Sequence, residues 1–247
     1  MRAFLITTLV AGAMFAQNPP EGTVEKTLHF TNTEKTQDLN EIATVVRSIG
    51  DIRQISVDSE QKTLTIQGTA AQIELAAWLF GALDLPTPSQ EFGTREYRPP
   101  NGGDDVVRVF YVAHIEPVQN LQEVATTVRS IGTIRRLFTY NALRAVALRG
   151  TAGQIALAGW LLQEFDQPAK DAAKHEFQVA ASGDEVVRVF YLPQTETVQR
   201  FQKIATEVRS SAQIYRLFTY NAPRAIALRG TPAQVAVADQ MIKQQIQ

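Results

Sequence analysis

The segment VVRVFY at residues 106–111 occurs again, unchanged, at residues 186–191. Two further segments match at the same shift of 80 residues: RLFTYNA at 136–142 matches 216–222, and ALRGT at 147–151 matches 227–231. Identity that stays in register over this length indicates two copies of one structural unit. The fold is therefore decided by this unit.

A third and more diverged copy precedes these two. EIATVVRSIG at 41–50 resembles EVATTVRSIG at 123–132, and the shift between them is 82 residues, so one loop differs by two residues. We predict modules over residues 27–86, 106–168 and 186–247, joined by Pro-, Gly- and charge-rich linkers over residues 87–105 and 169–185. Within the linkers, REY at 95–97 matches HEF at 175–177, which is consistent with a short extra strand.

The middle copy shows the elements most clearly. The run 106–112 is apolar at both odd and even positions, which is typical of a central strand covered on two faces. Apolar residues at helical spacing over 118–131 predict the first helix, and Gly132 after them predicts a left-handed cap. The runs 134–140 and 144–149 predict two strands that pair through a hairpin turn.

The second helix has clear start and stop signals. Thr151 and Gln154 form a predicted capping box, which Thr69 with Gln72 and Thr231 with Gln234 repeat. Asp166-Gln167-Pro168 ends the helix, because proline cannot continue it. The predicted fold class is α+β: three tandem βαββα modules, each with two helices packed on one face of a three-stranded sheet.

The N-terminal residues 1–16 predict a signal peptide. Arg2 precedes an apolar run over residues 3–15, and both Ala13 and Ala16 fit a cleavage site. We expect an exported protein, periplasmic or secreted, without a transmembrane segment after cleavage, although an uncleaved N-terminal anchor is the alternative. The sequence contains no cysteine, which excludes disulfides, thiol chemistry and cysteine-based metal sites.

Together these residues resemble one family. The βαββα order, the YNxxRA hairpin at 140–145, the GTxxQ start at 150–154 and the closing FDxP at 165–168 look like the periplasmic N-domain of secretins. The resemblance implies a KH-like module of the kind that occurs in tandem before an outer-membrane barrel and builds rings in type II, type III and type IV pilus machines. No barrel-forming segment follows in this sequence, so we expect fold and association to carry over, and secretion activity not to.

Candidate catalytic residues are scarce. The three histidines, His29, His114 and His175, have no counterparts in the other modules, and no triad or metal-ligand spacing appears. We therefore expect no enzyme activity, no cofactor and no metal. Nucleic acid is not an expected partner, because the formal charge of −1 gives no reason to expect binding to phosphate backbones.

Repeated arginines and aromatics suggest an interaction face. If Val107 and Val109 point toward the helices, one outer sheet face carries six residues: Arg108, Phe110, Arg149, Arg188, Phe190 and Arg229. Two interpretations remain open. This face is either an ordinary solvated sheet surface or a docking face for a neighbouring module or subunit.

We expect a non-enzymatic scaffold with protein partners, either a second copy in a homo-oligomer or an envelope secretion component. The alternative is a binding module for an anionic envelope ligand, such as lipid head groups or cell-wall polymer. The first module has lost the aromatic and arginine face, so we expect it to be a terminal cap or to have its own partner.

Overall fold

The structure is a computed structural model of the chain. It describes residues 22–87, 93–100, 102–167, 175–179 and 183–245. The signal peptide predicted over residues 1–16 lies outside the described residues.

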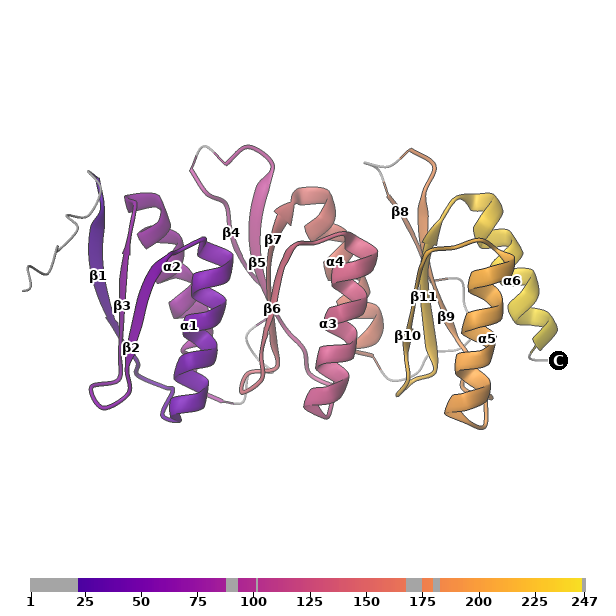
Figure 1. The fold of residues 1–247 in the computed structure, drawn as a ribbon, viewed down its shortest axis with the longest axis horizontal. Coiled ribbons are helices and arrows are strands. Elements are labelled where there is room, and N and C mark those ends of the chain that lie inside the picture. The colour runs from indigo at the N-terminus through magenta and orange to yellow at the C-terminus, as the bar shows by residue number, and fades with distance from the viewer. Residues whose placement is uncertain (1–21, 88–92, 101, 168–174, 180–182, 246–247) are drawn as a thin grey trace, which may run out of the picture.

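The chain forms three successive βαββα modules (Figure 1). Module 1 contains β1 (Val24–His29), α1 (Thr36–Gly50), β2 (Gln54–Asp58), β3 (Thr63–Gly68) and α2 (Ala70–Leu83). Module 2 contains β4 (Arg95–Tyr97), β5 (Asp105–Tyr111), α3 (Val118–Gly132), β6 (Arg136–Tyr140), β7 (Ala145–Thr151) and α4 (Ala152–Phe165). Module 3 contains β8 (His175–Gln178), β9 (Val186–Tyr191), α5 (Val198–Ser211), β10 (Arg216–Tyr220), β11 (Ala225–Gly230) and α6 (Pro232–Gln245).

Each module has one antiparallel sheet, and the α+β class is as predicted. The strand orders are β1-β3-β2, β4-β5-β7-β6 and β8-β9-β11-β10. Modules 2 and 3 therefore have four strands and not three, because β4 and β8 form within the segments predicted as linkers. The hairpin registers of modules 2 and 3 are identical, with Arg136 opposite Arg149 and Arg216 opposite Arg229.

Both helices of a module cover one face of its own sheet. In module 2 this core contains Val106, Val146 and Leu148 from the sheet with Leu121 and Leu161 from the helices, all fully buried. Burial of these and the other apolar core residues stabilises a module that has no disulfide.

The capping boxes form as predicted at all three second helices. In module 2 the Thr151 Oγ1 accepts from the Gln154 N–H at 3.2 Å, and the Gln154 Oε1 accepts from the Thr151 N–H at 3.0 Å. The same glutamine has an additional role, because its Nε2 donates to the Thr133 carbonyl at 2.9 Å. It thereby connects the start of the second helix to the end of the first.

The aspartate of the predicted Asp-x-Pro signal also holds the loop that follows the first strand. Its carboxylate accepts three backbone N–H bonds: Asp84 from Thr31, Asn32 and Thr33, and Asp166 from Ala113, His114 and Ile115. The aspartate thus fixes the loop between the first strand and first helix of its own module, in addition to ending the second helix.

The predicted left-handed cap at Gly132 is displaced by one residue. Gly132 is the last helical residue, and Thr133 adopts the left-handed conformation with φ of 52°. A Cβ at Gly132 would lie 3.0 Å from Ile134 Cδ1, whereas the matching residue of module 3 is Ala212. The matching residues Asp51 and Gln213 are also left-handed.

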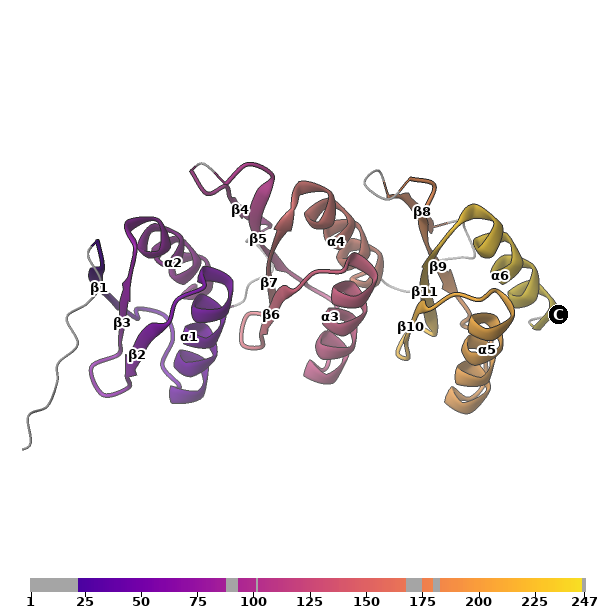
Figure 2. The ribbon, with the colours of Figure 1, turned by 45° about the horizontal axis from the view of Figure 1, so that its top comes forward.

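The three modules form a row in which sheet and helix layers alternate (Figures 1 and 2). The sheet of module 2 lies against the helices of module 1, and the sheet of module 3 lies against the helices of module 2. Consequently β5, β7, β9 and β11 are covered on two faces, which explains why β5 is apolar at both parities.

Replacing Thr133 by asparagine should stabilise the protein. A β-branched residue at positive φ is strained, whereas asparagine tolerates this conformation, so we expect a gain of about 0.5 to 1 kcal/mol. Chemical denaturation of Thr133→Asn measures it. Thr126→Asn, on the exposed face of α3, is the matched control and should not gain stability; an equal gain in both variants would contradict the explanation.

Candidate interaction site at the module interfaces

The outer face of each inner sheet is an apolar docking surface for the preceding module. Val107, Val109, Ala145 and Ala147 are fully or almost fully buried and belong to one cluster with the core of module 1. Val187, Val189, Ala225 and Ala227 make the same contact with module 2. Alanines at the centre of this face let the sheet approach the helices closely.

A carboxylate on the first helix binds the hairpin of the next module. Glu41 Oε1 accepts from Asn141 N at 3.1 Å and from Asn141 Nδ2 at 2.6 Å. Glu123 and Asn221 repeat this contact at the same distances, 3.1 and 2.6 Å. The Asn of the predicted hairpin turn is therefore an interface residue as well.

Arg149 and Arg229 lie at the two interfaces. The Arg149 Nη1 donates to the Ile49 carbonyl at the end of α1 at 3.1 Å, while its Nε donates to Asp105 Oδ2 at 2.8 Å. Arg229 donates in the same way to the Ile131 carbonyl at 3.1 Å and to Glu185 at 2.8 Å. Each guanidinium thus satisfies a helix C-terminal carbonyl, where the helix dipole favours a cation.

Aromatic residues complete each interface. The Tyr111 hydroxyl donates to the Ala82 carbonyl at 2.6 Å, and the Tyr191 hydroxyl donates to the Glu164 carbonyl at 2.8 Å. Burial raises the pKa of Tyr111 to about 12, so it donates its proton throughout the physiological range. The rings Trp78 with Tyr97 and Trp160 with Phe177 stack with centroids 5.4 and 5.6 Å apart.

One contact occurs only between modules 2 and 3. His175 Nδ1 lies 2.7 Å from Glu164 Oε2, and both side chains are 11% exposed. In the other interface the matching residues are Arg95 and Ala82, so the pair is not part of the repeated pattern. The other two histidines are exposed, His29 on β1 and His114 beside Asp166.

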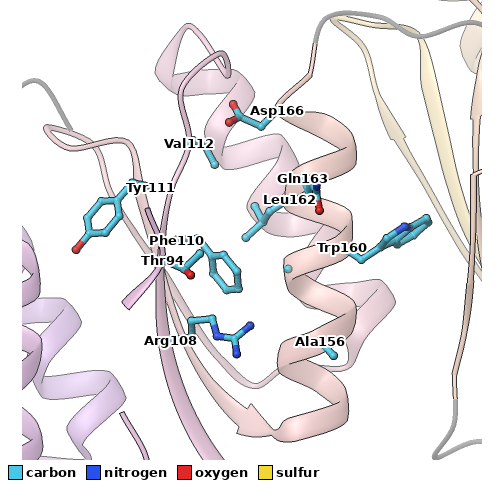
Figure 3. Close-up of a pocket in the computed structure, with 11 residues that line it drawn as sticks. Thr94, Arg108, Phe110, Tyr111, Val112, Ala156, Trp160, Leu162, Gln163 and Asp166 are labelled. Carbon is cyan, nitrogen blue, oxygen red and sulfur yellow. The ribbon is translucent and has the colours of Figure 1, made fainter. Parts of the chain in front are cut away.

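The structure brings Arg149 and Arg229 to the interfaces but places the other four predicted residues on the opposite sheet face. Val107 and Val109 point to the preceding module, so Arg108 and Phe110 point toward α4; Arg188 and Phe190 have the matching places in module 3. The prediction that Val107 and Val109 of β5 point toward the helices of their own module was wrong. Figure 3 shows Arg108 and Phe110 on one side of the strand and Tyr111 on the other.

The four displaced residues form local pairs. The Arg108 guanidinium lies 5.6 Å from the Phe110 ring centroid, and its Nε donates to Glu96 Oε2 at 2.9 Å. Arg188 bonds Glu176 on β8 at 2.9 Å and lies 5.8 Å from the Phe190 ring centroid. The short strands β4 and β8 therefore supply the carboxylates that neutralise these arginines.

Beside Arg108 and Phe110 lies a cavity of about 510 Å³ between the sheet and α4 (Figure 3). Gly159 leaves room for the Phe110 ring, because a Cβ there would lie 3.1 Å from Phe110 Cε1. In module 3 the matching residue is Asp239, whose Oδ1 lies 3.9 Å from Arg188 Nη1.

The two ends of the row lack the features of the inner interfaces. On the outer sheet face of module 1, Glu25, Thr27, His29 and Ser56 are exposed, whereas the inner modules have buried valines and buried or partly buried tyrosines and phenylalanines at the matching positions. Thr27 Oγ1 and Thr65 Oγ1 form an exposed hydrogen bond of 3.2 Å. This face is polar and suited to water.

The outer helix face of module 3 is more polar than the matching faces of modules 1 and 2, although Val237 on α6 is exposed there. Positions that contact the next module in the first two copies have changed character: Glu41 and Glu123 become Lys203, Val45 and Thr127 become Glu207, and Trp78 and Trp160 become Gln240. The outer face of α5 and α6 therefore lacks the residues that form the inner interfaces. An outer face of the kind expected of a terminal cap thus occurs in module 3 as well as in module 1.

In the part of the chain that the structure describes, no group of three or more His, Asp or Glu side chains could hold a metal ion. Within the same residues, no helix is long and apolar enough to span a membrane.

No protein-family model matches the chain, and no curated protein matches its sequence. Among solved structures, the N-terminal domain of the secretin XcpQ from Pseudomonas aeruginosa is similar at 13% identity and a TM-score of 0.30, covering 91% of this chain and 100% of that chain. A dimer mutant of this domain has 14% identity and a TM-score of 0.24, covering 59% of this chain and 63% of that chain.

ExeD of Aeromonas hydrophila is similar at 13% identity and a TM-score of 0.22, covering 91% of this chain and 41% of ExeD. The chain thus spans less than two thirds of the length of ExeD and of the XcpQ dimer mutant. XcpQ is a secretin by its own description, which is the family that the sequence motifs resemble.

Placing a charge at the centre of the first interface should uncouple module 1 from module 2. Ala147 is 1% exposed, so Ala147→Glu buries an unpaired carboxylate and should cost more than about 3 kcal/mol. Calorimetry should then show two transitions in place of one. Thr65→Glu is the matched control, because it occupies the same sheet position in module 1 where no module covers it; equal effects of both substitutions would exclude the interface explanation.

The interface carboxylate should make stability depend on pH. Burial raises the pKa of Glu123 above its ordinary value of 4.5, and the bonds from Asn221 only partly oppose the rise. The folded state then binds this proton more tightly than the unfolded state does. The contribution of Glu123 to the free energy of unfolding is therefore most favourable below pH 4.5 and decreases as the pH rises through its folded pKa.

Glu123→Gln keeps an acceptor for Asn221 without a charge. The free energy of unfolding of this variant should no longer decrease with rising pH through this group, and at pH 7 it should match or exceed that of the wild type. Denaturation across pH 4 to 8 measures it. Glu196→Gln on an exposed loop is the control and should follow the wild type. A Glu123→Gln protein that is less stable at every pH would show that the charge itself stabilises the interface.

Proposed function

We propose that the chain is an exported, non-enzymatic scaffold whose three modules are held in a fixed row for protein partners of an envelope assembly. The observation that supports this best is the repeated interface. Its residues, from Glu41 with Asn141 to Glu123 with Asn221, hold each sheet on the preceding helices by matching bonds. Because the repeated polar contacts fix the distance between neighbouring modules, the chain can present surfaces to partners at defined distances.

The periplasmic location and the secretin-type partner rest on the signal-peptide pattern and on the resemblance of the sequence motifs. In this proposal the protein partners dock on the sides of the row. Head-to-tail association of copies would have to bring the polar sheet face around Thr27 onto the polar helix face around Lys203, which offers little apolar area to bury. A homo-oligomer would therefore use the sides as well.

The alternative, a binder of anionic envelope ligands, gains no support from the arginines that suggested it. Arg108 and Arg188 are paired with Glu96 and Glu176, and Arg149 is paired with Asp105. Paired guanidinium groups in partly buried positions offer little free positive charge to an anionic surface.

Crosslinking in cells tests the scaffold function. The full chain, with a photoreactive residue on an exposed side position such as Thr126, should capture a component of an envelope secretion or pilus assembly in the envelope fraction. Ala227→Glu, which disrupts the second interface, should reduce this capture, and Thr65→Glu should not. Capture that is equal in all three proteins, or a chain that stays in the cytoplasm, would overturn the proposal.

Distance measurement supplies the structural control. Because the sequence contains no cysteine, cysteines introduced at Thr126 and Ser210 are the only sites for spin labels. The distance distribution should be narrow in the wild type and Thr65→Glu proteins and broad in Ala227→Glu. This separates loosening of the row from unfolding of the modules.

A further inference from the structure

The outer edge of β1 is open, whereas the matching edges of the other modules are covered. β4 pairs with β5 and β8 pairs with β9 at the side away from the hairpin. In the part of the chain that the structure describes, β1 pairs only with β3. In an antiparallel sheet, every second residue of such an edge strand directs its N–H and C=O outward.

The exposure of β1 reflects this difference. Every residue of β1 is exposed except Leu28, which is partly buried, whereas no residue of β5 is exposed. Part of the difference arises because, among the described residues, no helix layer covers Thr27 and His29. Lys26 is different, because it lies on the helix side of the sheet and its exposure is due to the open edge.

The covered edges indicate the chemistry that fits. β4 places Glu96 directly opposite Arg108, and β8 places Glu176 directly opposite Arg188. Lys26 is the residue of β1 that matches these arginines, and it forms no ion pair within the described residues. Module 1 thus keeps the basic side of a pair that the other two modules complete.

We propose that the open edge of β1 is a docking site for an extended segment of a partner protein that adds an antiparallel strand and places an acidic residue opposite Lys26. The segment would do for module 1 what β4 and β8 do for modules 2 and 3. Backbone bonds supply the affinity, and the charge pair sets the register. The proposal rests on the scaffold function and names one place where a partner binds.

A charge exchange tests this site. The probe is a peptide with the sequence of residues 174–179, KHEFQV, added to the isotope-labelled full chain and followed by NMR. The amides of β1 should shift, and Lys26→Glu should weaken binding about fivefold, because like charges then lie opposite each other. A peptide carrying Glu176→Lys should bind Lys26→Glu better than it binds the wild type. Arg135→Glu, at an exposed position just before β6, is the control and should bind like the wild type.

Several results would overturn the proposal. These are shifts located outside β1, affinity that does not respond to the charge exchange, or no binding at about 1 mM peptide. Outward-pointing β1 amides that are already protected from hydrogen exchange without peptide would also overturn it, because a second copy or another segment of the chain would then occupy the edge. None of these results depends on whether crosslinking in cells finds an envelope partner, so the two proposals fail separately.

Discussion

The packing of one module's sheet on the preceding module's helices is the contact on which the rest of the structure depends. A sheet with helices on one face has a second face that needs water or another layer. In modules 2 and 3 that face consists mainly of valines and alanines, with Ala147 and Ala227 at its centre, and burying it stabilises a chain that has no disulfides. Removal of one module would therefore expose the apolar face of the next.

The same contact is not repeated on the outer faces of modules 1 and 3. A repeated interface with matching donor and acceptor continues until one partner changes, and here both partners change at the terminal modules. Lys203 replaces the carboxylate that binds the next hairpin, and Thr27 and Ser56 replace the apolar outer sheet. Lys203 and Glu207 also favour water over an apolar neighbour.

Much of the fold could be predicted from sequence because its signals are local. The capping box of Thr151 with Gln154 and the hairpin at Asn141 depend on residues a few positions apart, and the structure contains both. The short strands β4 and β8 were only weakly indicated, because three or four residues with no long periodicity give little signal. The pairing of Glu96 and Glu176 on these strands with Arg108 and Arg188 could be recognised only once the strand order of the sheets was known.

The interaction site could be predicted only in part. The phase of β5 was wrong because the strand is apolar at both parities, and alternation cannot orient a strand that is covered on two faces. The partners of Arg149 and Asn141 lie about 100 residues earlier in the chain, on helix α1, so no local pattern could identify them. The pair of His175 with Glu164 was missed for the same reason, since it forms only when module 3 packs on module 2.

Native-state hydrogen exchange tests the central claim most directly, namely that the buried interfaces make the three modules one cooperative unit. The slowest amides of β3, β7 and β11, one central strand in each module, should exchange with a single opening free energy that equals the free energy of global unfolding. Three distinct opening free energies, each matching the unfolding of one module alone, would show that the modules are independent and would contradict the account.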